Sequence, residues 1–182
     1  MGGKIGYAAL KLDMSKAYDK VEWDFLRGMM VKLGFSLQWV ELLLRCITTG
    51  DPLSLYLFVI CAHGLSEMLT NFEQMKFYKG VSLASTCPSI SHLFFADNSM
   101  LFCRAWPSEC FQLRQCLLNY AKASGQSINF DKSTLYFSPN TGDQNMEEIC
   151  SMFEISQVEG HDMYLGLPTF SMRNKIIQFG YI

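Results

Sequence analysis

Two apolar runs separated by a single polar pair constrain the fold of this chain more than any other feature. Residues 92–96 and 99–103 are mainly apolar, and Asp97 and Asn98 lie between them. Short apolar runs joined by a two-residue Asp-Asn link are typical of a β-hairpin with a tight turn. The sequence therefore predicts two antiparallel strands, with Asp97 at the tip between them.

Helical spacing of apolar residues recurs through the rest of the chain. It predicts a first helix that follows Ser15 and has Val21, Phe25, Met29 and Leu33 on one face, and further helices over residues 37–47, 51–69, 109–124 and 142–154. Extended segments are expected over residues 7–12, 80–84, 127–138 (as strand-turn-strand) and 164–170. Ser15 is expected to cap the first helix at its N-terminus, and Gly34 and Gly125 stand where helix C-caps belong.

Strands and helices in this order are typical of an α+β protein whose helices pack on one face of a mostly antiparallel sheet. A length of 182 residues suits one compact domain. Hydrophobic residues make up 49% of the chain and charged residues 18%, which supplies a core and excludes disorder over most of the length. We therefore expect a single α+β domain over residues 1–182.

The net charge and the cysteine content limit the functions and compartments that suit this chain. The net charge of −2 argues against nucleic-acid binding by this chain alone, because phosphate contacts need Lys and Arg. The 7 cysteines form no Cys-x-x-Cys pair, as expected for reduced, buried thiols of an intracellular protein. The N-terminus shows no signal peptide, and the longest apolar run, residues 53–62, is too short to cross a bilayer. We expect no membrane contact, and nucleus and cytoplasm both stay open as compartments.

Two carboxylates stand at the ends of predicted strands. Asp13 follows the strand over residues 7–12, and Asp97 lies in the hairpin. If these strands are neighbours, the two carboxylates emerge close together and suit Mg²⁺, a hard cation with oxygen ligands. Each residue also has a structural interpretation: Asp13 could favour the N-terminus of the following helix, and Asp-Asn is a good turn pair.

Five segments stand in an order that points to one family. They are residues 11–23 (KLDMSKAYDKVEW), 50–58 (GDPLSLYLF), 95–98 (FADN), 124–133 (SGQSINFDKS) and 164–168 (YLGLP). In this order they resemble motifs A, B, C and D and the following segment of reverse transcriptases from non-LTR (LINE-type) retrotransposons, in a plant-like form. The resemblance covers nearly the whole chain and implies part of a polymerase palm.

The resemblance implies a catalytic centre that uses divalent metal ions. Asp13 and Asp97 would bind Mg²⁺ or Mn²⁺, with Asn98 beside them. Tyr18 would lie under the incoming sugar and disfavour ribonucleotides, although a helix-packing role fits the same aromatic side chain. The partners implied are an RNA template, a DNA primer and a deoxynucleoside triphosphate.

The remaining implied contacts lie around the nucleotide. Gly50, Asp51, Pro52 and Ser54 would shape the loop and helix start that contact template and nucleotide. Lys132 would lie near the triphosphate, although it also fits a solvated loop lysine.

Three departures from the family pattern predict loss of activity. Asn98 replaces the second aspartate of motif C, which removes one negative charge from the metal site. Thr49 directly precedes Gly50, where the family carries a long stretch between motifs A and B, and Leu55 replaces the usual Pro after Ser54. The family's fingers and thumb, which bring basic residues to the substrates, are expected to be absent.

Two further interpretations compete with a reverse transcriptase. One is a non-catalytic folded remnant or protein-interaction module, and the other a single-stranded nucleic-acid binder using aromatic side chains. The second is disfavoured because no cluster of basic residues accompanies the aromatics. Strands lost between motifs A and B would leave a sheet edge and an apolar face uncovered, so we also expect poor solubility or self-association.

Overall fold

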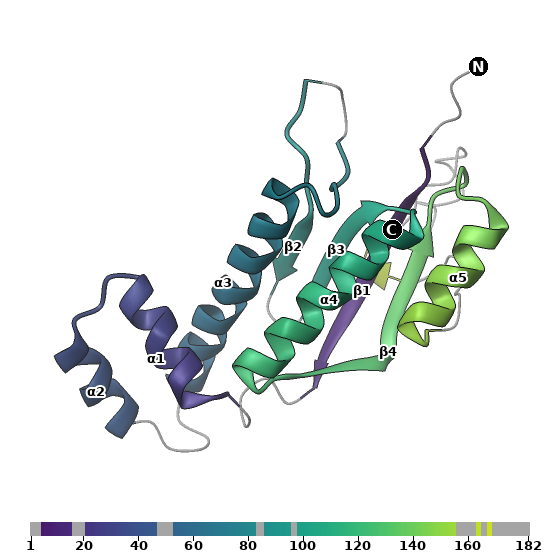
Figure 1. Ribbon diagram of the computed structural model, residues 1–182. Helices are drawn as coiled ribbons and strands as arrows, with labels where there is room; N and C mark the ends of the chain where they lie inside the picture. Colours follow the sequence, from purple (N-terminus) through teal and green to yellow (C-terminus); the bar gives the residue numbers. More distant parts are fainter. Residues whose placement is uncertain are drawn as a thin grey trace.

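A four-stranded antiparallel sheet forms the centre of the computed structural model, which describes residues 5–15, 21–46, 53–82, 86–95, 98–155, 163–164 and 167–168. The strands are β1 (Tyr7–Ser15), β2 (His92–Phe95), β3 (Asn98–Arg104) and β4 (Ser127–Phe137), in the spatial order β2-β3-β1-β4. Strand β1 thus lies inside the sheet, between β3 and β4 (Figure 1). Two short strands, β5 (Met163–Tyr164) and β6 (Leu167–Pro168), pair only with each other.

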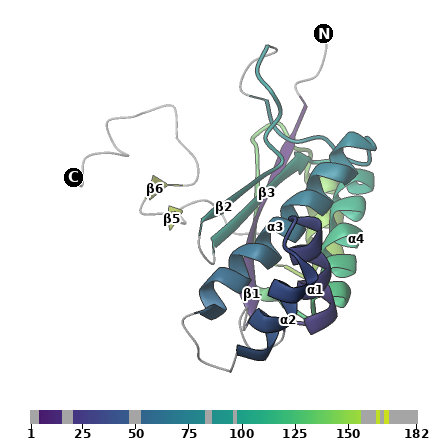
Figure 2. The same cartoon turned by 90° about the vertical axis from the view of Figure 1, so that its left-hand side faces the viewer.

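The helices lie on one side of this sheet. They are α1 (Trp23–Lys32), α2 (Leu37–Cys46), α3 (Leu53–Gln74), α4 (Pro107–Ser124) and α5 (Asp143–Phe153). Figure 2 shows α3 and α4 along the same face of the sheet, with α1 and α2 beyond them. The predicted α+β architecture, an antiparallel sheet with helices on one face, is confirmed.

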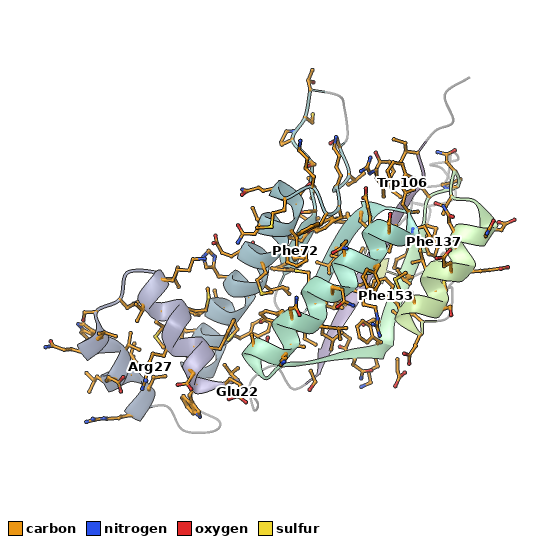
Figure 3. The ribbon with its side chains drawn as sticks, in the orientation of Figure 1. Glu22, Arg27, Phe72, Trp106, Phe137 and Phe153 are labelled. Carbon is orange, nitrogen blue, oxygen red and sulfur yellow. The ribbon has the colours of Figure 1, made fainter. Side chains whose placement is uncertain are left out.

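Alternation along β1 divides its side chains between two faces. Leu10 and Leu12 are 2% exposed and pack in one cluster with buried leucines of α3 and α4 and with Phe153 of α5 (Figure 3). Successive side chains of a strand point to opposite faces, so Ala9 and Asp13 lie on the face away from the helices. That second face carries its own small cluster around Ala9, which contains no helical residue among those described.

Helices α1, α2 and α3 share a second apolar cluster built around Leu26, Met30, Val40 and Cys61. A buried tyrosine connects it to α4, because the Tyr120 hydroxyl donates a hydrogen bond to the carbonyl oxygen of Cys61 at 3.0 Å. The Glu22 N–H also donates to the carbonyl of Ser124, the last residue of α4, at 2.8 Å (Figure 3). The α1–α2 pair is therefore attached to the main body through α3 and α4.

A polar network joins the end of α3 to the hairpin β2–β3. The Glu73 carboxylate accepts hydrogen bonds from the Gly80 N–H at 3.0 Å and from the Ser89 hydroxyl at 2.6 Å. The His92 ring, at the start of β2, bonds the Ser66 hydroxyl of α3 at 2.7 Å through Nε2. These contacts fix where the hairpin leaves the helix layer.

Most predicted elements are confirmed, and their ends follow the predicted signals. The β2–β3 hairpin is present, and Gly34 and Gly125 have φ of 91° and 74°, the left-handed conformation that a helix C-cap favours. Helix α3 extends five residues beyond the predicted end at Leu69, to Gln74. Residues 47–52, which include the predicted start of α3 at Asp51 and Pro52, lie outside the described residues.

Four local predictions were wrong. Ser15 is the last residue of β1, and Glu22 precedes α1 instead, so Ser15 caps no helix. Phe95 pairs with Asn98, so Asn98 belongs to β3 and the two linking residues are Ala96 and Asp97. Around residues 80–84 the structure has only an isolated bridge between Val81 and Ile90, and residues 83–85 lie outside the described part.

The fourth concerns residues 127–138, which form the single strand β4 with an internal irregularity, not two strands around a turn. In the described parts of the chain, no helix is long and apolar enough to cross a membrane.

Acid should destabilise the fold in two steps through the network at the end of α3. Burial lowers the pKa of His92 below its ordinary value of 6.5. Burial alone would raise the pKa of Glu73, but hydrogen bonds from Ser89 and Gly80 outweigh it and leave the pKa below 4.5. Below its ordinary pKa, each group binds protons more readily in the unfolded chain than in the folded one. Stability therefore decreases as the pH is lowered, first below about 6.5 and then below about 4.5.

Thermal unfolding followed by circular dichroism between pH 7.5 and 5 isolates the His92 step. His92→Gln should lose less melting temperature than the wild type over this range, because it removes the proton uptake. His63→Gln, a change at an exposed histidine, is the matched control and should behave as the wild type. Equal flattening in both variants would contradict the assignment to His92.

Candidate functional site

Asp13 occupies the middle of the sheet on its helix-free face. Its Cα lies opposite Asn98 of β3 on one side and opposite Asn129 of β4 on the other. Directly opposed residues of an antiparallel pair point to the same face, so the three positions line one stretch of that face. The Asp13 side chain is half-buried.

The neighbouring residues explain why β1 tolerates a carboxylate here. Leu12 and Leu10 point the other way and supply the buried contacts that hold β1 against the helices. The strand continues past Asp13 to Ser15, so the carboxylate stands within the strand and not, as predicted, at its end. Core packing and the polar group therefore use opposite faces of the same strand.

The β2–β3 hairpin sets the backbone of Asn98 opposite Asp13. Asn98, the first residue of β3, pairs with Asp13, and Asp97 is its covalent neighbour. Asp97 lies outside the described residues, and Asn98 is described by its backbone. The pairing of two carboxylates at this site stays a prediction, while the predicted proximity of the two strands is confirmed.

An irregularity in β4 brings Lys132 to the same part of the sheet. Lys11 pairs with Thr134 and Asp13 with Asn129, so residues 130–133 stand opposite Leu12 alone. Lys132 is exposed within this bulge, and its backbone N–H donates to Asn129 Oδ1 at 3.2 Å. Lys132 therefore belongs to the β4 segment next to Asp13, and its role near a nucleotide stays a prediction.

The bulge contains one polar residue, Ser133, whose role the sequence did not predict. The Ser133 hydroxyl accepts the backbone N–H of Asp13 at 3.1 Å and donates to the carbonyl of Asn129 at 2.7 Å. Ser133 lies in the segment that resembles motif D, but only the strand register could reveal that its hydroxyl contacts the Asp13 backbone.

The other predicted site residues are not placed around Asp13 by the described structure. Tyr18, Gly50, Asp51 and Pro52 lie outside the described residues. Ser54 is the second residue of α3 and is described by its backbone. Their roles stay predictions.

The atoms that could bind a metal ion at this site are mainly oxygens. Among the described residues, no three His, Cys, Asp or Glu side chains gather in a geometry suited to a metal ion. Asp13 contributes a carboxylate here, and Asn98 and Asp97 would add an amide and a carboxylate oxygen if their side chains reach the same point. Such donors fit Mg²⁺ or Mn²⁺ and suit soft metals poorly.

Comparison with known proteins covers almost the whole described fold. The sequence model of the family described as "Reverse transcriptase (RNA-dependent DNA polymerase)" matches residues 5–168. An uncharacterized mitochondrial protein of Arabidopsis thaliana is 30% identical over 99 residues, which cover 51% of this chain and 75% of that protein.

The location of Asp13 predicts a small role in stability. Asp13→Asn keeps the backbone N–H that bonds Ser133 and removes only the charge, so the free energy of unfolding should change by no more than about 0.5 kcal/mol. Leu12→Ala, at the adjacent position on the core face, should cost about 2–5 kcal/mol.

Urea denaturation of both variants tests this contrast. A loss in Asp13→Asn comparable to that in Leu12→Ala would make Asp13 a structural residue and not a site residue.

Proposed function

We propose that this chain, which belongs to the reverse transcriptase family, carries the palm region of a non-LTR (LINE-type) retrotransposon enzyme whose catalytic site has decayed. One observation supports the proposal above others. The register of β1 and β3 sets Asp13 opposite Asn98 on the helix-free face of the sheet. The resemblance implies that two metal-binding carboxylates, Asp13 and Asp97, meet here. Asn98, next to Asp97, carries an amide where the family has a second aspartate.

Members of this family bind a nucleic-acid template and primer and use divalent metal ions. In this chain, Asp13 and Asp97 would hold Mg²⁺ or Mn²⁺. When bound, such ions activate the primer 3′-hydroxyl and stabilise the leaving pyrophosphate. The helix-free face would receive the primer terminus, because the opposite face is filled by α3, α4 and α5.

The other site residues would act on the nucleotide itself. Tyr18 would contact the sugar and exclude a ribonucleotide. The segment of Gly50, Asp51, Pro52 and Ser54 would orient the template and the base. Lys132, exposed in the β4 bulge, would meet the charge of the triphosphate.

Two features account for the proposed loss of activity. The Asn98 amide oxygen can bind a cation but carries no charge, so a site with two carboxylates holds two divalent ions less tightly than one with three. At the Thr49–Gly50 junction, the stretch that separates motifs A and B in the family would be deleted. Its loss would remove substrate contacts and palm strands together.

The alternative is a folded remnant whose remaining capacity is protein interaction. Apolar side chains exposed on α1 and α2 favour it, among them Trp39 and Leu42, which are 61% and 53% exposed. Trp39 and Leu42 are three residues apart on one helix and therefore lie on the same side of it. An apolar surface of this kind is typical of a site that associates with another protein or another copy.

Primer extension on poly(rA)–oligo(dT), with Mg²⁺ and with Mn²⁺, tests the catalytic proposal. The wild type should extend no more than Asp13→Ala, because losing one electrostatic group of an active site costs on the order of 10²–10³ in rate. Asn98→Asp restores the missing charge.

Each outcome has a distinct meaning. Extension by the wild type that disappears in Asp13→Ala would show that the site still works and would overturn the proposed decay. Extension by Asn98→Asp but not by the wild type would show that the missing charge is the defect. No extension by any variant would assign the loss of activity to the proposed deletion between motifs A and B.

Self-association through α2 is expected from its exposed apolar side chains. Sedimentation velocity should show the wild type as oligomers and the double variant Trp39→Glu/Leu42→Glu as predominantly monomer. Tyr56→Glu, on α3 and 68% exposed in the wild type, is the control and should leave the distribution unchanged. A monodisperse wild-type monomer would contradict the expectation.

A further inference from the structure

We propose that Ser133 is a positioning residue for Asp13, and that its hydroxyl closes the interrupted β1–β4 ladder at the point where the carboxylate is attached. The role assigned to Asp13 rests on the proposed function. The mechanical part of the inference, that Ser133 fixes the Asp13 backbone, rests on the contacts of the bulge.

The bulge creates a gap that the ladder cannot close by itself. Between the pairs Lys11–Thr134 and Asp13–Asn129, β1 contributes only Leu12 while β4 contributes residues 130–133. Extra residues in one strand disrupt the regular pairing of N–H and C=O groups. Left unpaired in a half-buried position, such backbone groups are costly.

The Ser133 hydroxyl forms hydrogen bonds with both strands at this gap. Ser133 Oγ accepts the Asp13 N–H at 3.1 Å and donates its proton to the carbonyl oxygen of Asn129 at 2.7 Å. The donor and acceptor capacities of a hydroxyl allow both bonds at once. Asn129 is also the residue whose Cα lies opposite Asp13, so the hydroxyl bridges a cross-strand pair.

The surroundings make this bridge rigid. Ser133 is 5% exposed, so water competes little for its hydroxyl. The Asn129 side chain adds a second hydrogen bond within the bulge, because its Oδ1 accepts the backbone N–H of Lys132 at 3.2 Å. The Asp13 backbone is therefore held on its β4 side by a side chain, and on its β3 side by pairing with Asn98.

This arrangement matters for a cation because ligand position depends on the groups behind the ligand. Residues that orient a metal ligand typically contribute about 10–100-fold to metal affinity. A small displacement of β1 at Asp13 would move its carboxylate away from the Asp97–Asn98 segment. Ser133 would thus act on the site through Asp13 without touching substrate or metal.

The same strand pair provides a matched control. At the far end of β1, the Ser138 hydroxyl accepts the Tyr7 N–H at 2.9 Å, the same kind of bond from the same strand. Ser133→Ala and Ser138→Ala therefore remove equivalent bonds at opposite ends of β1. Only the first is next to Asp13.

Amide hydrogen exchange of the full-length, ¹⁵N-labelled chain measures the mechanical part directly. Ser133→Ala should speed exchange of the Asp13 amide by about tenfold or more, and Ser133→Thr, which keeps the hydroxyl, should restore slow exchange. Ser138→Ala should speed the Tyr7 amide and leave Asp13 unchanged. If Ser133→Ala does not fold, Ser133→Cys replaces it, because a thiol is a much weaker acceptor for the Asp13 N–H and a weaker donor to the Asn129 carbonyl.

Mn²⁺ binding, measured by water-proton relaxation in an Asn98→Asp background, tests the consequence for the site. Ser133→Ala should weaken binding by about 10–100-fold, while Ser133→Thr and Ser138→Ala should not. Equal effects of Ser133→Ala and Ser138→Ala on the Asp13 amide, or no rescue by Ser133→Thr, would overturn the inference.

The two proposals fail in different ways. Mn²⁺ binding that is indifferent to Asp13→Ala would overturn the proposed metal site, while the exchange of the Asp13 amide still decides the role of Ser133. Mn²⁺ binding that needs Asp13 but ignores Ser133→Ala would retain the metal site and overturn Ser133 as its positioning residue.

Discussion

The two-sided pairing of β1 is the constraint on which the rest of the structure depends. β1 is paired with β3 over its first seven residues and with β4 at both ends, and its inward leucines meet the helices. Moving this strand by one residue would turn Leu10 and Leu12 away from the core and bury Asp13 instead. The apolar core therefore sets the register, and the register places the carboxylate beside Asn98.

Stability and chemistry consequently occupy different faces of one sheet. The helix side contains the large buried cluster, whereas Asp13 and the Asn98 position belong to the other side. A charge can therefore be lost from the site without disturbing the packing that holds the fold. A chain of this design can keep a reverse transcriptase fold after a change in its site, and the proposed decay at Asn98 would be such a change.

Regular periodicity made the helices and the hairpin predictable, and its interruptions caused the errors. An apolar run indicated β1, a repeat of 3.6 residues indicated α4, and Gly34 and Gly125 indicated helix ends. Ser15 was assigned to a helix because cap residues and strand ends use the same polar side chains. Ser133 was missed because its partner Asp13 is 120 residues away in the sequence, and no local pattern indicates the register of a bulge.

The wide separation of the paired strands sets the order in which the chain can fold during synthesis. Helices α1, α2 and α3 share one apolar cluster drawn from a short stretch of sequence, but β1 receives β4 only after about residue 138 has left the ribosome. Until then, β1 exposes an edge with unpaired N–H and C=O groups. High contact order slows such pairing. The β1 edge is thus the place where a nascent chain is most open to chaperones, or to pairing with its neighbours.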